Sequence, residues 1–228
     1  DLNVGDSTFD QVTLQPRDLT TTSLMSRRLL IQSDPSIEAL VRADLAQQIA
    51  LGIDSAALTG NNTTDANQPD GLFNMSGTNA ISCGTPNGGA LTYELAVSFI
   101  TSVMQSNAMD LGGLGWLINA NVWQRAMTIS RDSGSGRFLM EDGLLVGQPW
   151  AHSEQIPSNF TEGSSGAVLN GAIFGAWSQL LLGEWGVLEL QTDPYTAVAS
   201  GAVRVNAFMT CDVAARHASA FSQSQDIT

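Results

Sequence analysis

Residues 33–60 read SDPSIEALVRADLAQQIALGIDSAALTG. Asp34 is suited to cap the free N–H groups at a helix start, and Pro35 suits the first helical position because no donor is needed there. Gly60 is suited to end the helix. Apolar residues recur between these signals at three- and four-residue spacing: Ile37, Leu40, Val41, Leu45, Ile49, Ile53 and Ala57. The pattern predicts a helix over residues 35–58, about 36 Å long. A helix of that length in a chain of this size is typical of a structural strut.

The composition limits what this helix can belong to. The chain has 228 residues, enough for one large domain or two modest ones, and 43% of them are hydrophobic, which favours a packed core over disorder. It contains 22 acidic and 9 basic residues, which gives a net charge of −13, and all the basic residues are arginine. Such a charge argues against tight binding to a nucleic-acid backbone or to anionic lipid. No apolar run reaches the length of a membrane span.

Helices and strands are both expected elsewhere, without a regular βαβ repeat, so the sequence predicts the α+β class. A second helix is expected over residues 92–108, capped by Thr92, with Leu95, Phe99, Val103 and Met104 on its buried side. A short buried strand at residues 116–118 precedes Asn119, which is expected to cap a third helix.

The remaining segments are expected to be extended or to turn. Residues 1–32 are predicted to be an extended arm, and residues 133–136 a turn. Strands are predicted at residues 138–140, 144–150, 168–171, 180–183, 187–190 and 202–216. The polar tail from Ser222 is predicted to fray.

No pattern for catalysis or metal binding stands out. The chain lacks the nucleophile-elbow, zinc-protease, EF-hand, Walker A and dinucleotide motifs. His152 and His217 are the two candidate bases, and a structural or surface role is favoured for each. Other groups considered are the loop carboxylates Asp65 and Asp70, the carboxylates Asp132, Glu141 and Asp142, and the cysteines Cys83 and Cys211, which are predicted to be free thiols. The sequence therefore predicts no catalytic, cofactor-binding or metal-binding residues, and an assembly protein is favoured over an enzyme.

The order of several short segments resembles a known family. Residues 26–30 and 33–39, then Leu58-Thr59-Gly60-Asn61 and residues 69–74, resemble the tailed-phage major capsid proteins of the Hong Kong type. Later similarities, in the family's order, are residues 116–119 with Trp123, 132–138, 144–149, 183–185, 193–195, and 214–217 with Phe221. The resemblance covers about residues 9–222.

This resemblance implies a fold of two lobes. Residues 1–65 and 185–217 would form a peripheral lobe, in which the long "spine" helix lies on a β-sheet. Residues 66–184 and 218–228 would form an axial lobe with a central sheet flanked by helices. Copies of the chain would form pentamers and hexamers of an icosahedral shell that encloses double-stranded DNA without binding it specifically. The family's partners also include a scaffold and a maturation protease, and its members occur in the virion after assembly in the bacterial cytoplasm. No cofactor, active site or membrane is implied.

Two departures from the family matter. The chain begins with Asp1, and the family's N-terminal arm would precede it, so a fragment lacking that arm is expected. Some relatives join subunits through a Lys–Asn isopeptide bond, for which this lysine-free chain offers no amine. Two alternatives stay open: an encapsulin-like compartment shell, and the capsid part of a fusion with a maturation protease.

Overall fold

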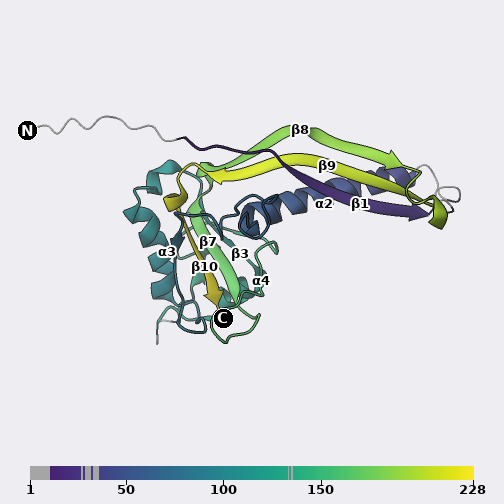
Figure 1. The fold of residues 1–228 in the computed structure, drawn as a ribbon. Helices are drawn as coiled ribbons and strands as arrows, with labels where there is room; N and C mark the ends of the chain where they lie inside the picture. Colours follow the sequence, from purple (N-terminus) through teal and green to yellow (C-terminus); the bar gives the residue numbers. More distant parts are fainter. Residues whose placement is uncertain (1–10, 27, 29–31, 33–35, 133, 135) are drawn as a thin grey trace, which may run out of the picture.

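The computed structural model describes residues 11–228 apart from 27, 29–31, 33–35, 133 and 135. Two parts stand at an angle to each other (Figure 1). One is a long, narrow sheet with a single helix along it, and the other is a rounder body built on a second sheet. The α+β class and this pairing of a long helix on one sheet with a second sheet flanked by helices were both expected from the sequence.

The helices and strands alternate irregularly along the chain. The helices are α2 (Ser36–Thr59), α3 (Tyr93–Gln105) and α4 (Ala120–Thr128), with short 3-10 helices η1 (Met109–Leu111), η2 (Trp177–Gln179), η3 (Val198–Ser200) and η4 (Ala218–Ala220). The strands are β1 (Arg17–Ser26), β2 (Asn79–Ala80), β3 (Leu114–Ile118), β4 (Met140–Glu141), β5 (Leu144–Leu145), β6 (Trp150–His152), β7 (Asn170–Ala176), β8 (Leu180–Asp193), β9 (Ala202–Ala215) and β10 (Phe221–Ile227).

The long sheet has the strand order β1-β9-β8, with all pairs antiparallel. Alternate residues of each strand face α2, as the two-residue period of a strand requires. The small core between sheet and helix consists of Met25, Leu45, Ile49, Val205 and Ala207. The other face of the sheet is largely polar and carries cross-strand hydrogen bonds such as Thr22 to Asn206, 3.0 Å. Among the described residues, a helix therefore covers only one face of this sheet.

The second sheet has the order β2-β10-β7-β3-β6 and holds the larger core. Every residue of β7 is buried. Trp116 of β3 lies with its ring centroid 4.9 Å from that of Phe174 in β7 and 5.2 Å from that of Phe99 in α3. These tilted aromatic contacts fix α3 on the sheet.

The predicted helices are found close to their expected bounds. At the end of α2, the Gly60 N–H donates to the Ala56 carbonyl oxygen, 3.1 Å. The Thr92 side chain accepts from the Leu95 N–H and that of Asn119 from the Val122 N–H, so both predicted caps are confirmed. The expected cap at Asp34 and Pro35, the turn at residues 133–136 and residues 1–10 of the arm fall partly or wholly outside the described residues.

Two apolar residues assigned to buried helix faces are exposed. Leu40 of α2 is 60% exposed and Met104 of α3 is 51% exposed. Leu40 is next to the inward-facing Val41, and only one of two such neighbours can face a narrow sheet. Met104 lies just outside the arc of α3 that the buried residues Phe99, Ile100 and Val103 cover. Neither helix has a purely polar outer face.

Several predicted strands are wrong in their bounds. Residues 144–150 do not form one kinked strand: a turn with positive φ at Val146 (50°) and Gly147 (75°) separates β5 from β6. The strand expected at 138–140 is reduced to β4, which pairs with β5. The strand expected at 168–171 begins at Asn170 and continues to Ala176.

The predictions at 180–183 and 187–190 were wrong in another way. The two segments form a single strand, β8, with a register shift between Trp185 and Glu189. Gly186 lies within this irregular stretch with φ of 85°, a conformation that suits glycine. Leu181 and Leu182 are exposed, because the described residues of the chain do not cover them.

The largest correction concerns the C-terminal tail, which does not fray. Residues 221–227 form β10, which lies between β2 and β7 inside the second sheet. The Ser222 side chain is completely buried. Its hydroxyl group is within hydrogen-bonding distance of two carbonyl oxygens, that of Phe99 at 3.1 Å and that of Phe174 at 3.2 Å. Buried polar side chains are tolerated when hydrogen-bonded, so a polar sequence can form an inner strand here.

Candidate functional site

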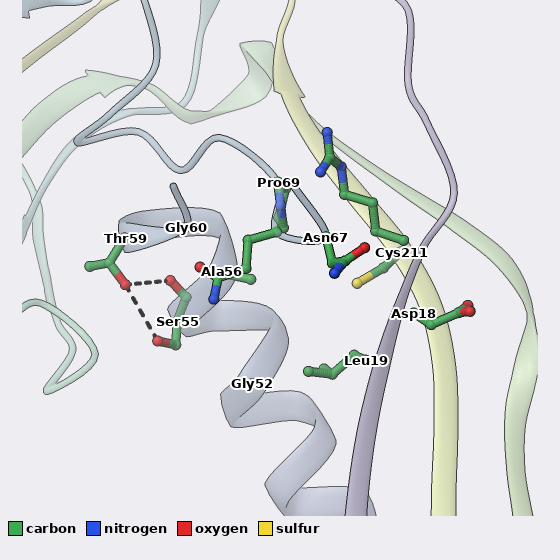
Figure 2. Close-up of a pocket in the computed structure, with 12 residues that line it drawn as sticks. Asp18, Leu19, Gly52, Ser55, Ala56, Thr59, Gly60, Asn67, Pro69 and Cys211 are labelled. Atoms are coloured by element: carbon green, nitrogen blue, oxygen red, sulfur yellow. Dashed lines mark hydrogen bonds between the residues drawn. The ribbon is translucent and has the colours of Figure 1, made fainter. Parts of the chain in front are cut away.

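A hollow of about 230 Å³ lies where the C-terminal half of α2 approaches β1 and β9 (Figure 2). Small residues of α2, Gly52, Ser55 and Ala56, form one wall, and Leu19 and Cys211 face them from the strands. A Cβ atom at Gly52 would lie 2.9 Å from Leu19 Cδ2, so the glycine lets β1 approach the helix. Burial raises the pKa of the Cys211 thiol. The hollow offers packing contacts and no activated nucleophile.

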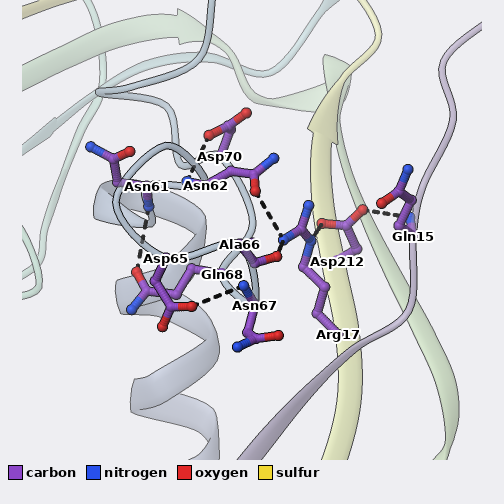
Figure 3. Close-up of polar contacts among 10 residues, drawn as sticks. All are labelled: Gln15, Arg17, Asn61, Asn62, Asp65, Ala66, Asn67, Gln68, Asp70 and Asp212. Carbon is purple, nitrogen blue, oxygen red and sulfur yellow. Dashed lines mark hydrogen bonds and ion pairs between the residues drawn. The ribbon is translucent and has the colours of Figure 1, made fainter.

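Polar contacts beside this hollow join three segments of the chain (Figure 3). The Arg17 guanidinium Nε, at the start of β1, lies 3.6 Å from Asp212 Oδ1 of β9. One guanidinium nitrogen donates to Asn62 Oδ1, 3.4 Å, and to the Ala66 carbonyl oxygen. The Arg17 and Asp212 side chains are only 13% and 9% exposed. We call this set of contacts the Arg17–Asp212 junction.

The loop that Arg17 reaches is ordered by its own side chains. Asn61 Oδ1 accepts from the Thr63 and Thr64 N–H groups at 2.9 and 3.1 Å. Asp65 Oδ1 accepts from Asn67 N and Asp70 Oδ1 from Asn62 N, each at 3.0 Å. The two loop carboxylates considered as candidates therefore build turns.

Asp212 also holds the chain that precedes β1. Its Oδ2 accepts from the Gln15 N–H, 2.7 Å. Leu14 lies over Gly183 of β8, where a Cβ atom would come within 2.9 Å of Leu14 Cδ1. This junction could not be predicted from the sequence, because Arg17 and Asp212 are far apart in the chain and belong to no motif.

The two histidines lie in different places and neither adjoins a nucleophile. His152 Nε2 is 2.8 Å from Glu154 Oε1, with both side chains at least half exposed. Hydrogen bonds from the Ala120 N–H and from His152 lower the pKa of Glu154. His217 is exposed between β9 and η4. Within the described part of the chain, no hydroxyl or thiol is hydrogen-bonded to either imidazole.

A buried polar cluster surrounds Asp226 in β10. Its carboxylate accepts from Ser82 Oγ at 2.8 Å, from the Cys83 N–H at 2.8 Å and from Ser224 Oγ. Burial alone would raise the pKa of Asp226, but these hydrogen bonds outweigh it and hold the pKa below its usual value. The cluster ties the last strand to the loop after β2.

The neighbouring titratable groups do not form a reactive centre. Burial raises the pKa of Cys83 to about 12, so its thiol is protonated and unreactive near neutral pH. Partial burial and the nearby Asp226 raise the pKa of Glu162. Among the described residues, no three His, Cys, Asp or Glu side chains are grouped to hold a metal ion. Glu141 lies 3.9 Å from Arg137 in an exposed ion pair.

Large apolar side chains are exposed along the long sheet and at its far end. We call Leu181, Leu182, Trp185 and Val187 the β8 strip; Val187 is 86% exposed. In the turn between β8 and β9, Tyr195 is 83% and Val198 63% exposed. Because β8 is an edge strand, the strip combines unpaired backbone groups with apolar side chains, which is typical of an interaction surface. None of the described helices is both long and apolar enough to cross a membrane.

The comparisons with known proteins identify the family. The model of the phage capsid family matches residues 3–225. The chain belongs to the phage capsid family. A curated relative, the major capsid protein of Halomonas phage phiHAP-1, is 29% identical over 218 residues. That match covers 96% of this chain but 33% of the relative, so the chain spans about a third of the relative's length.

Solved structures of low identity share the fold. The capsid of a native GTA particle computed with C5 symmetry superposes with a TM-score of 0.71 at 18% identity, covering 100% of this chain and 80% of that one. The holo-SrpI encapsulin complex of Synechococcus elongatus PCC 7942 gives a TM-score of 0.61 at 14% identity, covering 93% and 74%. The resemblance to capsid proteins seen in the short sequence segments is thus confirmed, and so is the fold class.

Proposed function

We propose that this chain is the shell-forming part of a major capsid protein, which assembles into the icosahedral head of a tailed phage or prophage. The observation that carries the proposal is the β8 strip, whose apolar side chains lie on an edge strand and are left exposed by the described part of the chain. Family membership supports a structural role for this surface. In a shell, neighbouring copies would bury it.

The two parts of the molecule take the two roles expected in such a shell. Residues 1–65 and 185–217 form the peripheral lobe, which contains α2 and the long sheet apart from residues 180–184 of β8. Residues 66–184 and 218–228 form the axial lobe, which gathers around the five-fold and six-fold axes. The separate cores of the two sheets support this division. Head-to-tail contacts between copies, which close into rings, then give pentamers and hexamers.

The packaged double-stranded DNA is enclosed without specific binding. A net charge of −13 supports this, since an acidic wall does not hold the polymer. The proposal predicts an inner face without a basic surface. A strongly basic inner face in an assembled particle would overturn it.

The chain acts without catalysis, cofactor or metal. Its support is the protonated Cys83, the surface position of His152 and the absence of a nucleophile–base pair in the described residues. A serine-reactive probe should leave the protein unlabelled, and a labelled residue would contradict this part of the proposal. A scaffold and a maturation protease are the other partners we propose, with assembly in the bacterial cytoplasm and final location in the virion.

An encapsulin-like compartment shell is the second candidate, favoured by the fold shared with the encapsulin complex. The contents of the particle distinguish the two. Packaged DNA supports the capsid, and an enclosed enzyme supports the compartment. A third arrangement, a capsid segment fused to a maturation protease, would add a protease outside the residues described.

Electron microscopy of the full chain tests the proposal. The full-length protein is expressed with its scaffold and protease, and the product is viewed in negative stain. Uniform closed shells are expected. Soluble monomers under all these conditions would contradict the shell role while leaving the fold unchanged.

A further inference from the structure

We propose that the Arg17–Asp212 junction is a latch that fixes the direction in which residues 11–16, here called the arm, leave the long sheet. Resting on the proposed function, we infer that this direction sets which surface of a second copy the arm reaches. The latch consists of the contacts of Arg17, Asp212 and the Gln15 N–H.

The arm is held at Gln15, which lies just outside the strand pairing of the long sheet. Pairing between β1 and β9 begins with Arg17 opposite Cys211, so Gln15 has no partner in the ladder. Its N–H donates to Asp212 Oδ2 at 2.7 Å instead. A side-chain carboxylate therefore takes the place of the strand carbonyl that would otherwise orient this residue.

Arg17 provides the counter-charge of that carboxylate and holds it in place. Asp212 is 6% exposed, and a carboxylate buried to this extent requires a counter-charge. Arg17 provides it at 3.6 Å and is itself held by Asn62 and by the Ala66 carbonyl oxygen, both in the loop after α2. The direction of the arm is thus linked to the loop where the chain passes from one sheet to the other.

Beyond the latch, the arm lies on the strand that carries the exposed strip. Leu14 covers Gly183, which has no Cβ and allows this close approach, and Trp185 of the β8 strip lies beside the same glycine. Leu14 of the arm and Trp185 of the strip thus both lie against Gly183. A second copy that covers the strip would meet the arm, which is why the partner we infer is another copy of this chain.

Hydrogen exchange measured by mass spectrometry on the full, unassembled chain tests the latch. Asp212→Asn keeps the shape but removes the charge, and Gln15→Pro removes the N–H donor while leaving both charges. Asp18→Asn is the matched control, because Asp18 is a β1 carboxylate that accepts from Thr210 and does not touch the arm. We expect the Gln15 N–H to exchange at least about tenfold faster in Asp212→Asn than in the wild type, because its acceptor is weakened, with the β7 segment unchanged.

The outcomes separate a latch from a general structural contact. Unchanged exchange of the Gln15 N–H in Asp212→Asn would overturn the proposal. Equal acceleration at Gln15 and in β7 would do the same, because it would indicate loss of overall stability. Gln15→Pro, whose effect is read by microscopy, keeps the proposal testable if Asp212→Asn fails to fold.

Negative-stain microscopy of the same variants tests the inference about the second copy. We expect wild type and Asp18→Asn to form uniform shells and Gln15→Pro to lose them. Uniform shells from a variant with a loosened arm would overturn the inference about the second copy. If wild type itself forms no shells, the proposed function fails and that inference with it, whereas the exchange result still decides the latch.

Discussion

The two sheets of this protein differ in how completely the chain covers them. All seven residues of β7 in the five-stranded sheet are buried, whereas none of the fourteen residues of β8 in the long sheet is buried. The buried aromatic rings Trp116, Phe99, Phe174 and Phe221 all belong to the core of the five-stranded sheet. The core between the long sheet and its single helix contains only five buried residues, two of them from the helix. One sheet carries its own stability, and the other leaves surface that neighbouring copies can complete.

Removing an aromatic ring from the five-stranded sheet should have the largest effect. Phe174→Ala leaves a cavity between Trp116 and β10 and should lower the free energy of unfolding by about 4 kcal/mol. Urea denaturation measures the change. Phe138→Ala, at a side chain that is 45% exposed, should cost less than about 1 kcal/mol. Equal losses in the two variants would contradict the claim that the buried core of the five-stranded sheet carries its stability.

Breaking the junction at the start of the long sheet should have the next largest effect. Arg17→Ala leaves Asp212 buried without a counter-charge and should cost about 3 kcal/mol, again measured with urea. The control is Arg137→Ala, whose ion pair with Glu141 has side chains 64% and 39% exposed and should contribute less than about 1 kcal/mol. A loss in Arg17→Ala no larger than the control's would show that the junction adds nothing to stability.

A smaller, pH-dependent effect is expected at the Asp226 cluster. The pKa of Asp226 lies below its ordinary value of 3.8 in the folded chain, so its hydrogen bonds stabilise the fold above that pH. This contribution is lost as the pH falls through the folded-state pKa. The urea midpoint should therefore drop more for the wild type than for Asp226→Asn between about pH 5 and about pH 3. Parallel curves would rule out a stabilising carboxylate.

A change on the β8 strip should have almost no effect on the subunit itself. Val187→Asp alters a side chain that is 86% exposed and should change the free energy of unfolding by less than about 0.5 kcal/mol. Shell formation should nevertheless fail, because a carboxylate would be buried between copies. Val187→Thr, of similar size and uncharged, is the control. Normal shells from Val187→Asp would remove this position from the contact surface.

Features that depend on residues close together in the chain could be predicted from the sequence, whereas those that depend on distant residues could not. The bounds of α2 and the caps at Thr92 and Asn119 depend on residues a few positions apart, and these were predicted. The last strand was predicted as a frayed tail. Its polar side chains have partners that are distant in the sequence, such as the Phe99 carbonyl oxygen for Ser222, more than a hundred positions away. The Arg17–Asp212 junction was missed for the same reason.

The exposed face of α2 illustrates a second limit. Leu40 fits the apolar period of the helix, but a sheet only three strands wide cannot contact every apolar position. Similarly, the apolar residues of β8 are typical of a buried strand, although the described part of the chain leaves every residue of β8 at least partly exposed. Sequence patterns record burial in the final assembly as well as in the subunit, so they cannot distinguish a core from a contact surface.

Hydrogen exchange of β8 in the full chain, before and after assembly, tests the central claim most directly. We predict that the backbone N–H groups of residues 181–187 exchange at least about tenfold more slowly in assembled shells, while those of β7 stay equally protected in both states. Identical exchange of β8 in the two states would contradict the claim that neighbouring copies complete the long sheet.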